Sequence, residues 1–171
     1  MTQNKGEYIT KEHYVFLTTL VNKQGDLYLI NEKEVEKLGW ILSNDELDDN
    51  SIFDEYADDL AKAMNRLGCK NFYVIQADDL FYNPDNTKYY SFPATLDGVE
   101  DFQGLLEWQD VLSLFDCLIF GPNLEFVVYR PDTTYYTSYA GPKAFVDMAL
   151  KTLREREASG YFEEDHSGEE W

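Results

Sequence analysis

Negative charge dominates this chain and limits both how it can fold and what it can bind. Acidic residues number 33 against 14 basic ones, so the formal net charge is −19 over 171 residues. The excess is also local, because residues 71–142 contain only two basic residues, Lys88 and Arg130. Self-repulsion on this scale opposes a compact state and excludes binding to phosphates or anionic membranes. We therefore expect no nucleic acid and no membrane among the partners, and we expect the charge to serve binding to a basic protein.

A large apolar fraction indicates that this acidic chain nevertheless folds. Hydrophobic residues make up 44% of the sequence and aromatic residues 16%, which is too much apolar matter for a disordered acidic chain. The length fits one domain. We assign residues 1–156 to a single domain and residues 157–171 to an acidic, mobile C-terminal tail.

Periodic patterns along the chain predict an α+β architecture. Strands are expected at 13–21, 26–30, 71–77, 88–92, 116–120, 124–129 and 133–139. Helices are expected at 32–38 with Asn31 as cap, at 51–67, at 104–115 and from Pro142 onward, and 43–50 reads as an acidic loop. Short turns between consecutive strands favour antiparallel pairing. The predicted fold is an antiparallel sheet of about five or six strands, with three or four helices packed mainly on one face.

The cysteines and the termini indicate a cytoplasmic location. Cys69 and Cys117 lie in apolar stretches and are predicted to be buried thiols in a reducing compartment. Residues 1–10 are polar and resemble no signal peptide. The apolar runs are only a few residues long, whereas a membrane span needs about 20. We therefore expect a soluble, cytoplasmic protein.

Sequence motifs for catalysis are lacking. Asp78 and Asp79 follow an apolar strand, where paired carboxylates can hold a divalent metal. No His or basic residue follows before Lys88 to complete such a site, so a solvated turn is the favoured interpretation. His13 and His166 lie in no motif, and neither a phosphate-binding glycine loop nor a nucleophile elbow is present. We predict no catalytic residue, no metal and no cofactor.

The strongest candidate for a binding surface is a run of carboxylates between residues 45 and 59. It contains eight acidic residues and no basic one, namely Asp45, Glu46, Asp48, Asp49, Asp54, Glu55, Asp58 and Asp59. In the predicted helix they form two i,i+4 pairs of like charge, which cost a few tenths of a kcal/mol each. Residues four apart lie about 6 Å from each other along a helix, a spacing comparable to that of phosphates in a nucleic-acid strand.

A merely solubilising face is the alternative interpretation of this run, but the net charge of −19 favours a binding surface. Neutralising the Asp residues at 48, 49, 58 and 59 is expected to slow association with a basic partner and to leave folding unharmed.

Tyrosines supply a second set of candidate contacts. The chain contains 13 of them, too many for the core alone, and we predict that Tyr82, Tyr135 and Tyr136 help to bind the partner. Exposed tyrosine beside carboxylates is typical of tight protein interfaces. Tyrosines on a partly exposed edge strand are the alternative.

Four classes of function are compatible with these features. The favoured one is an acidic inhibitor that occludes a basic enzyme, as immunity proteins do with nuclease toxins, because carboxylates replace substrate phosphates and opposite charge speeds association. The second is a nucleic-acid mimic or phage anti-defence protein acting on a DNA- or RNA-binding machine, which needs two rows of charge at duplex spacing. The others are a small enzyme with a non-phosphate substrate and a salt-adapted acidic module.

Overall fold

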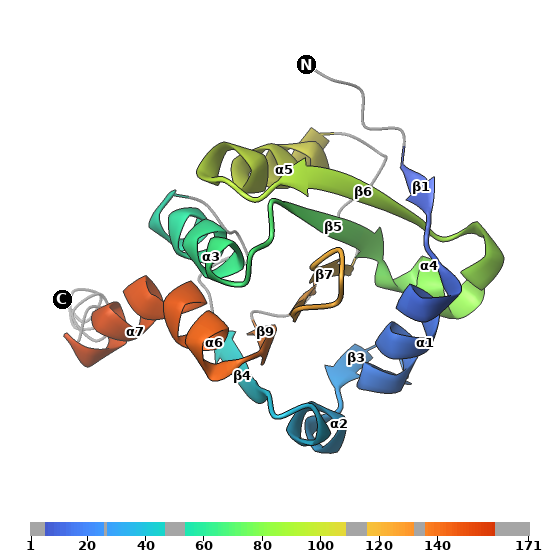
Figure 1. The fold of residues 1–171 in the computed structure, drawn as a ribbon, viewed down its shortest axis with the longest axis horizontal. Helices are drawn as coiled ribbons and strands as arrows, with labels where there is room; N and C mark the ends of the chain where they lie inside the picture. Colours follow the sequence, from blue (N-terminus) through green and yellow to red (C-terminus); the bar gives the residue numbers. More distant parts are fainter. Residues whose placement is uncertain (1–5, 26, 47–53, 109–115, 132–135, 160–171) are drawn as a thin grey trace, which may run out of the picture.

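The computed structural model describes residues 6–25, 27–46, 54–108, 116–131 and 136–159, which form a layered α+β fold (Figure 1). Its large sheet contains the strands β1 (Glu7–Tyr8), β4 (Ile41–Glu46), β5 (Asn71–Gln76), β6 (Lys88–Pro93), β7 (Cys117–Phe120), β8 (Val127–Arg130) and β9 (Tyr136–Gly141). A separate hairpin consists of β2 (Val21–Gln24) and β3 (Leu27–Ile30). The helices are α1 (Lys11–Leu20), α2 (Glu32–Lys37), α3 (Asp54–Arg66), α4 (Ala77–Tyr82), α5 (Leu96–Trp108), α6 (Lys143–Ala149) and α7 (Lys151–Ala158), and a 3-10 turn, η1, spans Pro84–Asn86.

The large sheet is antiparallel throughout its described strands. Their order is β1-β6-β5-β7-β8-β9-β4, with β1 and β4 at the two edges. The predicted α+β class and the antiparallel pairing are therefore confirmed. The predicted numbers of strands and helices are too low, because the described residues form seven strands in this sheet and seven helices.

Helices cover both faces of the sheet, so the prediction that they pack mainly on one face is wrong. In β7, Cys117 and Ile119 join a core cluster with α3, α5, α6 and α7, whereas Leu118 and Phe120 join a second cluster with α1, α2, α4 and the hairpin. All four side chains are fully buried. A strand that is apolar on both faces needs a cover on each side. The second cover is the layer at the lower right of Figure 1.

The segment predicted as a strand at 13–21 is instead the helix α1. Thr10 caps it, because its side-chain oxygen accepts a hydrogen bond from the backbone N of His13 at 3.1 Å. His13, Leu17 and Leu20 lie at helical spacing and face the sheet. The β-branched residues that suggested a strand are accommodated, since the Thr19 hydroxyl donates to the Val15 carbonyl at 2.7 Å. Tertiary packing here overrides local strand propensity.

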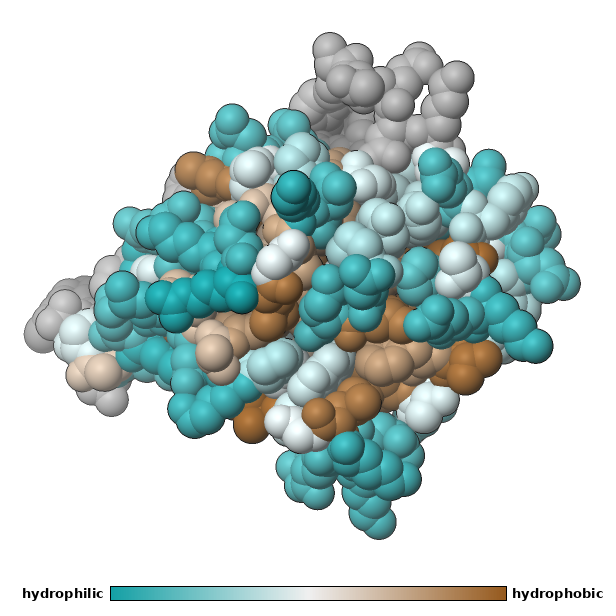
Figure 2. Space-filling view, in the orientation of Figure 1, coloured by the Kyte–Doolittle hydropathy of each residue, from teal (hydrophilic) through white to brown (hydrophobic). Residues whose placement is uncertain are grey.

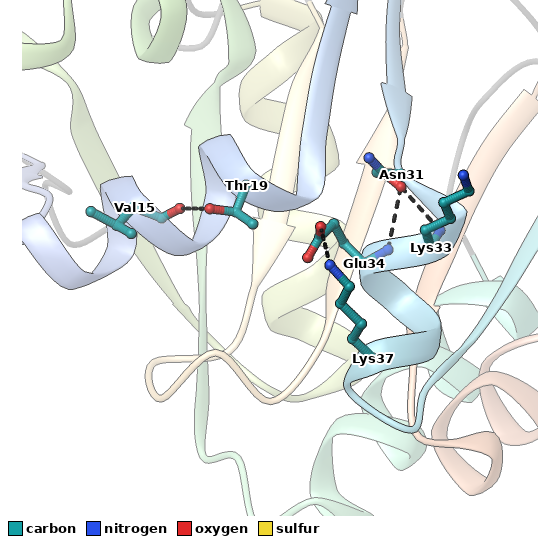
Figure 3. Close-up of polar contacts among 6 residues, drawn as sticks. All are labelled: Val15, Thr19, Asn31, Lys33, Glu34 and Lys37. Atoms are coloured by element: carbon teal, nitrogen blue, oxygen red, sulfur yellow. Dashed lines mark hydrogen bonds and ion pairs between the residues drawn. The ribbon is translucent and has the colours of Figure 1, made fainter.

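Other predicted elements are confirmed, some with shifted boundaries. The strands expected at 26–30, 71–77, 88–92, 116–120, 124–129 and 133–139 overlap β3, β5, β6, β7, β8 and β9, and the helices expected at 32–38 and 51–67 overlap α2 and α3. Asn31 caps α2 as predicted, by accepting hydrogen bonds from the backbone N of Lys33 and of Glu34 (Figure 3). The expected stops Gly39 and Gly68 have φ values of 72° and 80°.

Three boundaries differ from the prediction. The acidic loop expected at 43–50 begins as strand, because β4 pairs with β9 up to Glu46. The helix expected at 104–115 begins earlier, at Leu96, where the Thr95 hydroxyl accepts a hydrogen bond from the backbone N of Gly98 at 3.0 Å. At the C-terminal end, α7 includes Glu157, which the sequence analysis placed in the tail. Most of that tail, residues 160–171, lies outside the described residues.

Candidate functional site

Two of the predicted partner-binding carboxylates on α3 are ion-paired within the protein. Glu55 pairs with Arg156 of α7. Asp58 pairs with Lys62 one turn further along the helix, with 2.9 Å between Oδ2 and Nζ. The guanidinium of Arg156 also donates to the hydroxyl of Tyr56 at 2.8 Å. Cations from outside the segment 45–59 therefore offset part of the charge that the sequence analysis assigned to partner binding.

Asp59, one of the carboxylates predicted to bind the partner, is buried and hydrogen-bonded inside the protein. Its side chain is only 6% exposed, and Oδ2 accepts a hydrogen bond from the backbone N of Thr152 at 2.8 Å. Thr152 lies in the first turn of α7, and the N-cap residue of that helix, Leu150, supplies no side-chain hydrogen bond. Asp59 therefore caps α7 from a distance and places a negative charge at the positive end of the helix. Loss of this carboxylate should therefore destabilise the fold.

We expect Asp59→Ala to lower the free energy of unfolding by about 2 kcal/mol, because the variant leaves the partly buried backbone N–H of Thr152 without its acceptor. Urea denaturation followed by circular dichroism measures this loss. Asp58→Ala is the matched control, since it removes a neighbouring carboxylate whose ion pair is at the surface and should have a much smaller effect. Equal losses in the two variants would show that Asp59 has no capping role.

The remaining predicted site residues that the structure describes lie on several different elements. Asp45 and Glu46 end β4, where they lie opposite Thr137 and Tyr136 of β9. Tyr82 ends α4, which covers the opposite face of the sheet from α3; its side chain is 64% exposed, with Lys23 Nζ 5.2 Å from the ring centroid. Asp54 begins α3. Asp48, Asp49 and Tyr135 lie outside the described residues.

An acidic surface that the sequence analysis did not single out lies on α5. Asp97 and Asp101 are exposed and one helical turn apart, and neither has an ion-pair partner within the described part of the chain. The two basic residues of the segment 71–142 are engaged elsewhere. Arg130 is only 8% exposed, and Lys88 Nζ lies 5.2 Å from the ring centroid of Tyr8. The charge count over 71–142 signalled this surface, but the helix start at Leu96 was needed to locate it.

The pair Asp78 and Asp79 lies in the first turn of α4 and not in the predicted solvated turn. Tyr28 donates its hydroxyl hydrogen to Asp78 Oδ1, and Tyr129 donates to Asp116 Oδ2 at 3.0 Å. Burial and these carboxylates raise the pKa of both tyrosine hydroxyls. Both phenols therefore remain protonated hydrogen-bond donors at neutral pH, which suits a structural polar network.

Burial, followed by the charge of Asp78, raises the pKa of Asp79 as well. Within the described residues, no group of three or more His, Cys, Asp or Glu side chains is arranged to hold a metal ion.

His13 and the two cysteines are held inside the fold. The Nε2 atom of His13 lies 3.1 Å from the carbonyl oxygen of Pro122, and the side chain is 8% exposed. Cys69 and Cys117 are buried free thiols, as predicted. Burial, with a contribution from Glu125, raises the pKa of Cys69 to about 12, so this thiol stays protonated and unreactive at neutral pH.

Comparison with protein-family models, with curated proteins and with solved structures found no match to this chain. None of the helices in the described ranges combines the length and apolarity needed to cross a bilayer.

Proposed function

We propose that this protein binds and occludes a basic site on another protein, and that it acts as an inhibitor of the immunity-protein kind against a nuclease-type toxin. The observation that supports this most is the net charge of −19 on a folded α+β domain. Such a charge opposes folding through self-repulsion, and an oppositely charged partner relieves that repulsion in the complex. Carboxylates take the place that substrate phosphates occupy in a nuclease cleft.

The contact surface we propose centres on Asp97 and Asp101 of α5, for which the described residues supply no ion-pair partner. Asp97 and Asp101 need not exchange an internal ion pair for an external one, whereas Glu55 and Asp58 would have to do so. Asp48 and Asp49 remain proposed contacts from the original segment. Charges of this kind act mainly on the rate of association, because they steer the partner toward the surface before contact.

The test compares two double variants with the same change in charge. Asp97→Asn with Asp101→Asn alters the proposed surface. The control, Glu32→Gln with Glu36→Gln, alters two exposed carboxylates of α2. Like Asp97 and Asp101, these residues are four positions apart, and the first of them lies in the first turn of its helix. Partners are captured from host lysate with the tagged intact protein, identified by mass spectrometry and purified. Stopped-flow association rates are then measured across a salt series, together with inhibition of the partner's nuclease activity.

We expect the α5 variant to associate about fivefold more slowly than wild type at low salt, and the difference to shrink as salt screens the charges. The α2 variant should associate at nearly the wild-type rate. Equal rates for both variants would remove α5 from the interface. A captured partner that is not basic, or whose activity continues in the complex, would refute the proposed inhibitor function.

A further inference from the structure

An apolar groove runs between α1 and α2, on the layer that covers the second face of the sheet. Its volume is about 590 Å³, and Val15, Phe16, Leu20, Leu38 and Leu124 line it. Val15 and Leu38, which line the same groove, are 52% and 44% exposed. Figure 2 shows apolar residues in brown toward the lower right of the molecule, in the region of α1 and β3.

The hairpin beside the groove adds further exposed apolar residues. Along β3, Tyr28 and Ile30 point into the core, whereas Leu27 and Leu29 point outward and are 45% and 47% exposed. We refer to residues 11–38, which contain α1, β2, β3, α2 and the C-cap residue Leu38, as the N-terminal layer. Its outward face therefore carries both a groove and an apolar ridge.

Leu124, which forms part of one wall of the groove, has an unfavourable backbone conformation. Leu124 has a φ of 59°, in the left-handed region that residues other than glycine rarely adopt, at a cost of about 1 kcal/mol. A hydrogen bond from its backbone N to the carbonyl of Gly121, at 2.9 Å, closes the turn. Strain of this kind concentrates at binding sites. Here it places an apolar side chain against α1 and α2.

The net charge of the chain is concentrated away from this layer. Residues 1–37 contain six acidic and five basic residues and carry a net charge of −1, whereas residues 38–171 contain 27 and nine and carry −18. The groove rim carries both signs, with Lys11 and Glu12 on α1 and the ion pair Glu34–Lys37 on α2, whose charged atoms are 3.1 Å apart (Figure 3).

We propose that the N-terminal layer is the interface with a second copy of this chain. Two molecules of charge −19 repel each other, and they can approach closely only through a surface that is nearly neutral. A two-fold axis brings the same patch of both copies together, so that the ridge at Leu27 and Leu29 of each copy faces the groove of the other. The mixed rim is self-complementary in such a pair, because α1 and α2 each contribute one cation and one anion to the groove lining.

This interface is independent of the proposed acidic surface, and the two respond to salt in opposite ways. Salt screens the repulsion between the two copies and leaves apolar burial intact, so self-association strengthens as salt rises. Binding of a basic partner weakens under the same change. Failure of either proposal therefore leaves the other standing.

Sedimentation equilibrium of the intact protein tests the proposal. At about 100 µM chain, where a micromolar association is nearly complete, we expect a mass twice the 19.9 kDa of one chain. The association should tighten between about 0.05 and about 0.5 M NaCl. Val15→Glu and Leu38→Lys should each weaken it at least about tenfold, although they change the net charge in opposite directions. Both positions are exposed, and circular dichroism verifies that the variants fold.

Leu96→Glu is the matched control, since it places a charge on a partly exposed leucine, 38% accessible, outside the N-terminal layer. It should leave the association unchanged. A single-chain mass under all conditions overturns the proposal, as does a dimer that survives Val15→Glu and Leu38→Lys or that is lost equally with Leu96→Glu. A single-chain mass together with binding of an apolar dye, lost in Val15→Glu, would assign the groove to a different occupant and overturn the proposal as well.

Discussion

Phe72→Ala is expected to lower the free energy of unfolding by about 4 kcal/mol, the largest effect we predict for a single substitution. Phe72 is fully buried on β5. It stacks on Phe92 with ring centroids 5.5 Å apart, and Phe102 of α5 packs edge-on at 6.1 Å. The variant loses the transfer free energy of the ring and leaves a cavity among side chains from three elements, which cannot all collapse into it.

Chemical denaturation of both Phe72→Ala and Tyr82→Ala tests this prediction, because it compares the loss of a buried ring with the loss of an exposed one. Tyr82 is also aromatic but is 64% exposed, so its truncation should change stability by less than about 0.5 kcal/mol. If Phe72→Ala cost no more than Tyr82→Ala, the packing of α5 against β5 and β6 would be incorrect.

Gly98→Ala should lower the free energy of unfolding by about 3 kcal/mol, although alanine favours a helix over glycine by about 1 kcal/mol. Gly98 lies in the first turn of α5, where the helix crosses the end of β6. A Cβ at this position would meet the backbone carbonyl of Pro93, with the carbonyl carbon only 2.8 Å away. Because the obstacle is backbone, α5 must move away from the sheet, and Val99 and Phe102 move with it.

Gly68→Ala offers a useful contrast for the same measurement. A Cβ at Gly68 meets no atom within 4 Å, and the cost there comes from its φ of 80° alone. For Gly98→Ala, hydrogen exchange should show lost protection in α5 in addition to the lower stability. A gain in stability would mean that helix propensity decides the outcome and that the close approach to Pro93 is absent.

Periodic segments with clear end signals were predictable. Asn31 and Gly39 mark the ends of α2, and the apolar runs of β5 and β7 identify strands without knowledge of their neighbours. These signals are local, because capping groups, left-handed glycines and side-chain periodicity act within a few residues. The same holds for the buried cysteines, which lie within such apolar runs.

The helix α1 escaped prediction, and α5 was predicted only over its C-terminal part. In α1, residues such as Val15 and Thr18 favour a strand locally, and only the packing of Leu17 and Leu20 on the sheet selects the helix. In α5, Gly98 argues against a helix start, and only its close approach to Pro93 explains why glycine is there. Taking α1 as a strand also removed one cover from the predicted layers, so the second face of the sheet went unnoticed.

The sequence by itself determined the net charge of −19 and the α+β class, because composition and short-range pattern suffice for these. The tertiary structure decided which carboxylates are engaged in contacts within the protein and which are exposed without an ion pair in the described residues. Asp59 turned out to cap α7, Glu55 to pair with Arg156, and Asp97 to remain without an ion-pair partner in the described residues. Such roles depend on partners as many as 101 positions away along the chain, and long-range contacts of this kind leave no periodic signal in the sequence.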